Sequence, residues 1–238
     1  MKLYDVQQNS LEWMSLRAGI PTASECGDLV TDKFEVRKGQ MPKTYLAQKL
    51  AEWWIGGALP GFNTLDMEFG KIREQYAIPY YELMYNKEVQ RVGFVTTDDG
   101  SIGCSPDGWL GDHGIEIKCL SMHNHVKILM AGQMPEEYAP QVHCSMLVTG
   151  ATEWKFMAYC PGFPAFVTTV YYDPKKHETL KEAYAQFDRA FRLGQARMIE
   201  LNDGKPPKPN PYREALLRGD KPGASEPEPE YAMEGITP

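Results

Sequence analysis

The sequence predicts an α/β fold, because segments with the apolar spacing of helices occur together with short segments that alternate apolar and polar residues. The chain has 238 residues, a length that suits one sizeable domain with or without an appendage. Hydrophobic residues make up 42% of the chain and aromatic residues 11%, so a packed core can form and global disorder is excluded.

The apolar spacing and the turn residues place the regular elements in order along the chain. Helices are predicted over residues 10–19, 42–57, 67–85, 124–132, 138–150 and 175–201. Strands are predicted over residues 89–96, 101–105, 108–111, 114–119, 152–160 and 165–173. Thr22 or Ser24 can cap a further helix, and Pro79 is expected to kink or interrupt the helix that contains it.

A change in composition after residue 202 predicts a domain boundary. Residues 203–238 hold eight of the eighteen prolines and show no apolar periodicity. We therefore expect a folded domain over residues 1–202 and a flexible proline-rich tail over residues 203–238.

Several classes of protein are disfavoured by what the chain lacks. No apolar run is long enough to cross a bilayer, and the first residues lack the apolar core of a signal peptide, so we expect a cytoplasmic protein without membrane contact. The five scattered cysteines include no CxxC pair, which favours reduced thiols over a zinc or iron–sulfur site. His123 and His125 lack suitably spaced partners and are interpreted as ordinary histidines.

The stretch "GCSPDGWLGDHGIEIK", residues 103–118, is the strongest chemical signal in the chain. It predicts a hairpin in which Ile115 and Ile117 point to one face and Glu116 and Lys118 to the other. Such a polar face is typical either of a solvated surface or of the wall of a site. The hairpin also brings Asp107 beside Glu116, and two carboxylates held so close favour a divalent cation with oxygen ligands.

The net charge of −7 does not by itself suggest a protein that binds nucleic acid, because phosphate binding requires cations. Positive charge is concentrated in one stretch, residues 33–49, where five basic residues accompany the single acid Glu35. These basic residues are Lys33, Arg37, Lys38, Lys43 and Lys49. Of them, Lys33, Arg37 and Lys38 are the predicted DNA contacts.

Pro106-Asp107, followed after eight residues by Glu116-Ile117-Lys118, matches the PD-(D/E)xK nuclease signature. The wider chain resembles the lambda exonuclease family of phage recombination nucleases. The matching stretches are residues 12–25, 69–77, 103–108, 115–119 and 138–150. The resemblance implies the restriction-endonuclease-like fold, a central mixed β-sheet flanked by helices.

The same resemblance implies a two-metal site for Mg²⁺, with Mn²⁺ as a substitute. Asp107, Glu116 and the backbone carbonyl of Ile117 would hold the first ion, and Glu74 would help to hold the second. Lys118 would orient or deprotonate the attacking water and offset the charge of the phosphate. Gln141 matches a glutamine of the family close to the metals and would orient the water or the scissile phosphate.

A phosphate pocket is predicted from Arg17, Thr22 and Ser24, because a guanidinium and two hydroxyls at a turn that leads into a helix suit an anion. In the family that the chain resembles, the equivalent residues grip the terminal 5′-phosphate of the strand that is degraded. Helix capping is the alternative role for Thr22 and Ser24.

The activity that the resemblance implies is metal-dependent 5′→3′ exonucleolytic digestion of linear double-stranded DNA. Mononucleotides would be released and 3′ single-stranded overhangs left for single-strand-annealing recombination. The expected partners are DNA ends with a 5′-phosphate, two further copies of the chain in a ring-shaped homotrimer, and a single-strand annealing protein. The location would be the cytoplasm of a bacterial host if a phage encodes the protein. A PD-(D/E)xK endonuclease of the restriction or repair type and a non-catalytic protein that binds DNA ends are the alternatives.

Overall fold

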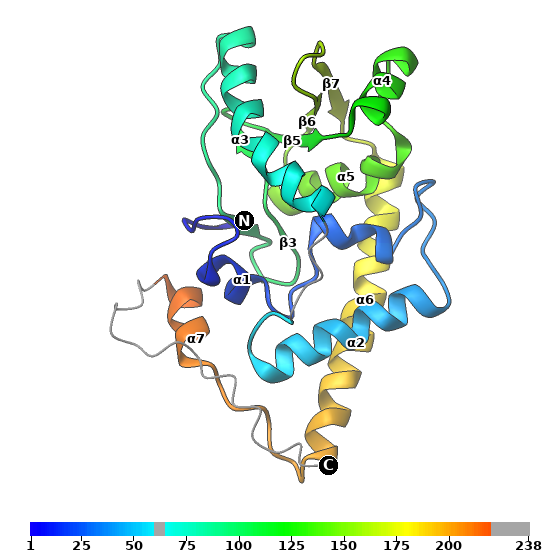
Figure 1. Ribbon diagram of the computed structural model, residues 1–238. Coiled ribbons are helices and arrows are strands. Elements are labelled where there is room, and N and C mark those ends of the chain that lie inside the picture. The colour runs from blue at the N-terminus through cyan, green and yellow to red at the C-terminus, as the bar shows by residue number, and fades with distance from the viewer. Residues whose placement is uncertain (60–64, 220–238) are drawn as a thin grey trace.

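The computed structural model describes residues 1–59 and 65–219, with the backbone alone over residues 65–74. The strands are β1 (Lys2–Tyr4), β2 (Phe94–Thr96), β3 (Gly103–Cys104), β4 (Gly108–Trp109), β5 (Gly114–Cys119), β6 (Glu153–Tyr159) and β7 (Phe166–Tyr171). The α-helices are α1 (Leu11–Arg17), α2 (Gln40–Ile55), α3 (Leu65–Tyr85), α4 (Met122–Ala131), α5 (Ala139–Thr149), α6 (Pro174–Leu201) and α7 (Pro211–Arg218). Two 3₁₀ helices, η1 (Ala23–Asp28) and η2 (Glu136–Tyr138), complete the set (Figure 1).

The strands form two sheets. Strands β4-β5-β6-β7 make a mixed sheet in which only β5 and β6 are parallel, and β1-β2-β3 make a smaller antiparallel sheet. The prediction of an α/β fold with a mixed sheet flanked by helices is therefore confirmed. The chain passes between the sheets at Pro106, which has no N–H for a ladder hydrogen bond. Strands β2, β3 and β4 are shorter than predicted.

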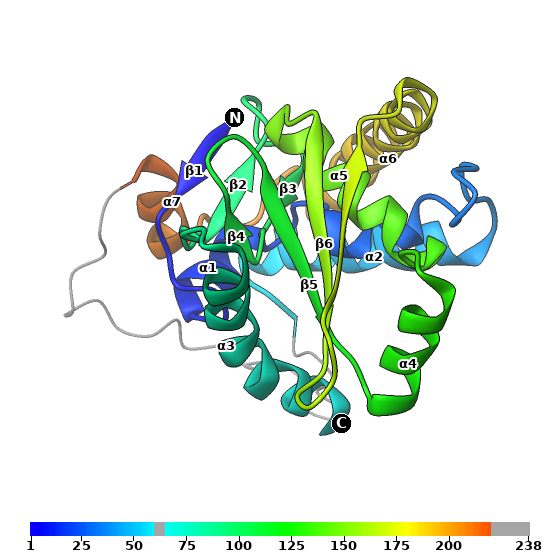
Figure 2. The ribbon, with the colours of Figure 1, turned by 90° about the horizontal axis from the view of Figure 1, so that it is seen from above.

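The mixed sheet has helices on both faces (Figure 2). On one face, Ile115 and Ile117 of β5 pack with Ala77, Ile78 and Tyr81 of α3. Because these α3 residues are buried against the sheet, the helix continues through Pro79, and the prediction of an interruption there is wrong. On the other face, α4 and α5 pack over β6, where Val142 of α5 and Phe156 of β6 are both fully buried.

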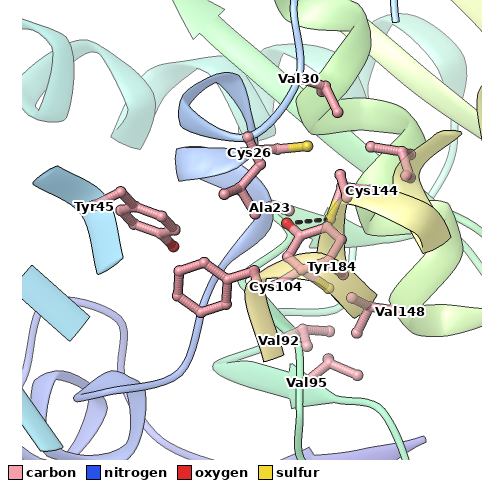
Figure 3. Packing of buried hydrophobic residues seen from close by; sticks show 14 residues of the cluster. Ala23, Cys26, Val30, Tyr45, Val92, Val95, Cys104, Cys144, Val148 and Tyr184 are labelled. Atoms are coloured by element: carbon pink, nitrogen blue, oxygen red, sulfur yellow. Dashed lines mark hydrogen bonds between the residues drawn. The ribbon is translucent and has the colours of Figure 1, made fainter. Parts of the chain in front are cut away.

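A second core joins the elements that carry the two predicted sites (Figure 3). Cys26 of η1, Cys144 of α5 and Tyr184 of α6 are buried together, and the Tyr184 hydroxyl lies 3.1 Å from the Cys144 sulfur. All five cysteines are unpaired thiols. This packing fixes η1, next to the predicted phosphate pocket, against α5, which carries Gln141.

Part of the segment predicted as a flexible tail, residues 203–238, is helical; residues 220–238 lie outside the described residues. Residues 211–218 form α7, which packs on α1, and Leu216 is buried there. Asn210 accepts hydrogen bonds from the backbone N–H groups of Tyr212 and Arg213, so an N-cap and the following Pro211 start this helix despite the surrounding prolines. Within the described part of the chain, no helix combines the length and the apolar character that a membrane span requires.

Two buried histidines make the packing of α5 on α6 sensitive to pH. Burial lowers the pKa of His143 to about 4, and Lys176 and His177 act in the same direction. Burial likewise lowers the pKa of His177 to about 4, with Lys181 adding to the effect and Asp173 opposing it. Both pKa values lie below the value of 6.5 for a free histidine. Between about pH 4 and pH 6.5 the unfolded chain therefore binds more protons than the folded chain.

We therefore expect the free energy of unfolding to be fully developed above about pH 6.5 and to fall as the pH falls toward 4. Denaturant unfolding at a series of pH values measures this slope. The variant His177→Gln should show a shallower slope, and His123→Gln should keep the slope of the wild type because His123 is exposed. Equal slopes in all three proteins would contradict the attribution of this pH dependence to the buried histidines.

Candidate active site on the β4–β5 hairpin

The β4–β5 hairpin places Asp107 opposite Glu116. Gly108 pairs with Ile115 and Trp109 with Gly114, and the same register extended by one residue aligns Asp107 with Glu116. The Ile117 backbone N–H donates a 2.6 Å hydrogen bond to Asp107 Oδ2, which fixes this carboxylate beside β5. Gly108 is required next to Asp107, because a Cβ there would overlap the Val89 side chain.

Glu116, Lys118 and Gln141 form a closed triangle of polar contacts between β5 and α5. Lys118 Nζ lies 2.7 Å from Glu116 Oε1 and donates a 3.0 Å hydrogen bond to Gln141 Oε1. Gln141 Nε2 donates in turn to Glu116 Oε1 at 2.6 Å. Gln141 lies in the first turn of α5, next to Pro140, so the start of that helix aims its amide at the strand.

The electrostatics of this triangle keep Lys118 charged. Burial lowers the pKa of Lys118, but the nearby Glu116 carboxylate, with a smaller contribution from Asp107, outweighs that effect and raises the pKa above its ordinary value. Lys118 Nζ also lies 5.4 Å from the centre of the Tyr138 ring. Both predicted carboxylates therefore act on the same ammonium group, as the sequence pattern predicted.

A groove of about 590 Å³ opens beside this hairpin. Asp107 and Ile117 line one part of it, and the exposed side chain of Arg91 lines another. Gln8 Nε2 donates to the carbonyl oxygens of Val92 and Pro106, both at 2.8 Å, so the N-terminal segment holds the wall of the groove. The volume lies within the range of small-molecule sites.

The donor set of the hairpin suits a hard divalent cation. Asp107 and Glu116 supply carboxylate oxygens and Ile117 supplies a backbone carbonyl, the ligand types that Mg²⁺ prefers. Among the residues with described side chains, no group of three or more His, Cys, Asp or Glu residues is placed to hold a metal. The predicted further ligand, Glu74, lies in α3, and its side chain is outside the described residues.

The structure also brings together the three residues of the predicted phosphate pocket. Arg17 Nη2 donates to the hydroxyls of Thr22 and Ser24, each at 3.3 Å, and the two hydroxyl oxygens lie 3.2 Å apart. Thr22 occupies the N-cap position of η1, but its hydroxyl donates to Glu25 Oε2 at 2.8 Å. The prediction that Thr22 caps this helix therefore holds for its position, but the side chain makes no capping hydrogen bond, because its hydroxyl donates to the Glu25 carboxylate instead.

Two residues that the sequence analysis did not assign also contact Arg17, namely Trp13 and Ser105. Arg17 Nη1 donates to Ser105 Oγ at 3.4 Å, and Trp13 Nε1 donates to the same oxygen at 2.8 Å. The Arg17 guanidinium lies 4.2 Å from the centre of the Trp13 ring. The sequence held one signal for each residue. Ser105 stands two residues before Asp107, and Trp13 stands four residues before Arg17 on one helix.

A buried network of polar contacts lies next to Arg17 and Thr22. Lys49 lies 3.0 Å from both Glu25 Oε2 and Glu52 Oε2, and Glu52 accepts a hydrogen bond from the Gly19 N–H at 2.9 Å. Burial raises the pKa of Glu25, but Lys49, Thr22 and Arg17 together outweigh it, so that the pKa lies below its ordinary value. Burial also lowers the pKa of Arg17.

The basic residues of the stretch over residues 33–49 differ in their exposure to solvent. Lys33 and Lys38 are exposed, whereas Arg37 Nε donates to the carbonyl oxygens of Gly27 at 2.6 Å and Val30 at 3.2 Å. Lys49, counted in the same stretch, is 3% exposed and is neutralised by its two carboxylate partners. Lys49 therefore adds no free positive charge to the surface, and Arg37 is half-buried with its Nε bound to backbone carbonyls.

Comparison with solved structures gives the same fold for this chain. The structure of LHK-Exo in complex with dAMP matches with a TM-score of 0.73 at 24% identity, over 82% of this chain and 98% of that one. A second structure of this alkaline exonuclease, from Laribacter hongkongensis, matches with a TM-score of 0.68 at 24% identity, over 81% and 100%. A phage-related exonuclease from Haemophilus somnus 129PT matches with a TM-score of 0.57 at 11% identity, over 75% and 96%.

Comparison with curated protein sequences gave no significant match. A family model does match, that of the YqaJ-like viral recombinase domain, over residues 12–152. This range holds more than half of the chain and includes the hairpin, Gln141 and the Arg17 pocket. The resemblance to phage recombination exonucleases is thus confirmed for the family and the fold: the chain belongs to the YqaJ-like viral recombinase domain family.

Proposed function

We propose that this protein is a magnesium-dependent nuclease that digests linear duplex DNA in the 5′→3′ direction, releasing mononucleotides and leaving 3′ overhangs. The main observation behind this proposal is that the segment Ser105-Pro106-Asp107 joins the predicted phosphate pocket to the carboxylate site. Ser105 accepts a hydrogen bond from Arg17 in the anion pocket, and Asp107 lies in the carboxylate site. The Cα atoms of Ser105 and Asp107 are at most about 7 Å apart, so a terminal phosphate and the phosphate that is cut can be held by neighbouring residues.

In this proposal Asp107, Glu116 and the Ile117 carbonyl hold the first Mg²⁺, and Glu74 contributes to a second. When bound, two such ions would supply an activated water and offset the negative charge that develops during cleavage. Lys118 orients that water and offsets the charge of the phosphate. Gln141 contacts both Lys118 and Glu116, so it fixes their separation before the substrate arrives.

The relatives support this choice of substrate. LHK-Exo was crystallised with dAMP, a deoxynucleoside monophosphate, and exonucleolytic digestion of DNA would release products of that class. The further proposed features are a homotrimeric ring around the DNA and a single-strand annealing protein as partner. With a net charge of −7, such a ring would need basic residues, including Lys33 and Lys38, to face the DNA.

Digestion of linear duplex labelled at its 5′ or 3′ end, with and without a 5′-phosphate, tests the proposal. We expect early release of the 5′ label as a mononucleotide in the presence of Mg²⁺. Cleavage of a covalently closed circle would instead indicate an endonuclease, and binding to DNA ends without nucleotide release would indicate a non-catalytic protein.

The variant Arg17→Ala should lose activity selectively on 5′-phosphorylated ends. A charge-assisted contact of this kind contributes about 1.5–3 kcal/mol, or about ten- to a hundredfold in binding. Ends with a 5′-hydroxyl never used the contact and should be digested nearly as before. The quantity to measure is the ratio of the two losses in kcat/KM.

A matched control is Arg192→Ala, because Arg192 is exposed on α6 and pairs only with Asp188 among the described residues. This variant should leave both rates unchanged. If Arg17→Ala lowers the two rates by the same factor, Arg17 contacts the DNA backbone in general and the terminal-phosphate pocket is rejected.

A further inference from the structure

We infer that the C-terminal helix α7 is a positioning element for the terminal-phosphate pocket, and that Arg213 is the residue through which it acts. This inference rests on the proposed function and extends it to a part of the chain beyond residues 12–152, the range that the family model matches. No residue of α7 belongs to the pocket itself.

Arg213 donates hydrogen bonds to the backbone on both sides of Arg17 in the sequence. Arg213 Nε donates to the carbonyl oxygen of Ser15 at 2.9 Å, and Arg213 Nη2 donates to that of Ala18 at 2.7 Å. The last carbonyls of a helix have no partner within it, and α1 ends at Arg17. The rigid fork of the guanidinium therefore fixes the backbone on both sides of the pocket arginine.

Apolar packing connects α7 to the other side of the same pocket. Leu216 is buried with Leu16 and Phe94, and Trp13 packs at the edge of this cluster. The Trp13 ring lies under the Arg17 guanidinium, and Trp13 Nε1 donates to Ser105 Oγ. A shift of α7 would therefore move the ring on which Arg17 rests.

Further contacts hold α7 at both ends of α1 and at the end of α2. Tyr212 donates to Glu12 Oε1 at 2.8 Å, in the first turn of α1. Asn210 Nδ2 donates to the carbonyl oxygen of Gly56, which caps α2, also at 2.8 Å. Because α2 carries the Glu52 carboxylate that binds the Gly19 N–H, the segment that contains Arg17 is fixed from two directions.

This support matters because α1 has only seven residues. A helix of that length is not stable by itself in water, so its position depends on packing and on caps. Loss of the Arg213 side chain leaves the carbonyls of Ser15 and Ala18 without these donors. The consequence we expect is a displaced Arg17, and hence weaker binding of a 5′-phosphate with unchanged chemistry at Asp107 and Lys118.

The test compares Arg213→Ala with the wild type on duplexes that carry a 5′-phosphate or a 5′-hydroxyl. We expect KM for phosphorylated ends to rise about tenfold, while kcat and the digestion of hydroxyl ends stay within about twofold, because small displacements of positioning groups have effects of this size or larger. Arg197→Ala is the matched control, because Arg197 is exposed and pairs only with Glu200 in the described structure. It should behave as the wild type.

Thermal unfolding of each variant separates positioning from stability. If Arg213→Ala does not fold, Arg213→Lys replaces it, since a lysine retains the charge but cannot donate to both carbonyls in the geometry of a guanidinium. Equal losses on both kinds of end, or an unchanged preference for the phosphate, would overturn the role of α7. A wild-type enzyme that shows no preference would instead reject the phosphate pocket of the proposed function.

Discussion

The variant Asp107→Asn is expected to lose all detectable metal-dependent hydrolysis of duplex DNA while it remains folded. An asparagine can still accept the hydrogen bond from the Ile117 N–H, so the hairpin keeps its geometry. The variant lacks the negative charge that would neutralise a divalent cation beside Glu116. Nucleotide release from linear duplex, together with calorimetric titration of Mg²⁺, measures both effects.

The same hairpin provides the control for this experiment. Asp112 lies in the turn between β4 and β5, where its side chain is 92% exposed and contacts His113. Asp112→Asn removes an identical charge a few residues away and should leave activity unchanged. If Asp107→Asn retains substantial turnover, the metal site has been assigned to the wrong carboxylate.

The variant Lys118→Ala is expected to lower kcat by about 10²–10⁴, the usual contribution of a side chain that assists proton transfer or stabilises charge at the reacting atoms. Binding of Mg²⁺ and of duplex DNA should persist, because Asp107 and Glu116 remain. Single-turnover cleavage and calorimetric titration of Mg²⁺ separate the chemical step from metal binding.

Lys155→Ala is a suitable comparison, since Lys155 lies on the adjacent strand β6 and donates only to Thr169 among the described residues. It should cleave at the rate of the wild type. A clear loss of Mg²⁺ affinity in Lys118→Ala would show that Lys118 organises the carboxylates rather than acting on the substrate.

The elements that the sequence predicted best are those fixed by a local pattern. Strand β5 begins and ends where the alternation of Ile115, Glu116, Ile117 and Lys118 places it. In the helix predicted over residues 175–201, the apolar spacing of Leu180, Tyr184, Phe187 and Phe191 indicates one inward face; the first three are buried on α6 and Phe191 is half-buried. In both cases a single face of one element decides the outcome, so neighbouring residues carry enough information.

The features that the sequence did not predict depend on contacts between distant segments. Nothing near Lys49 in the sequence indicates that Glu25 will neutralise it, and α7 forms because α1 offers it a surface nearly two hundred residues earlier in the chain. The division of the strands into two sheets likewise depends on how β2 pairs with β1 at the start of the chain. Tertiary contacts of this kind leave no periodic signal.

For the candidate site, the sequence located the groups that share a hairpin or a turn. The structure brings Glu116, Lys118 and Gln141 into direct contact and gathers Arg17, Thr22 and Ser24 into one pocket. Their catalytic and binding roles stay predictions. Ser105 was missed because a serine in a turn is common, so its position two residues before Asp107 is a weak signal until the structure shows Arg17 beside it.

The short segment from Ser105 to Asp107 has a consequence for how such an enzyme would measure its substrate. Its ends belong to the anion pocket and to the carboxylate site, and Pro106 restricts the backbone between them. In the proposed function this segment would set the distance between the terminal phosphate and the bond that is cut, independently of the base sequence. An exonuclease with such a fixed distance would release fragments of constant size. Lengthening the segment by one residue should then change the size of the product as well as the rate.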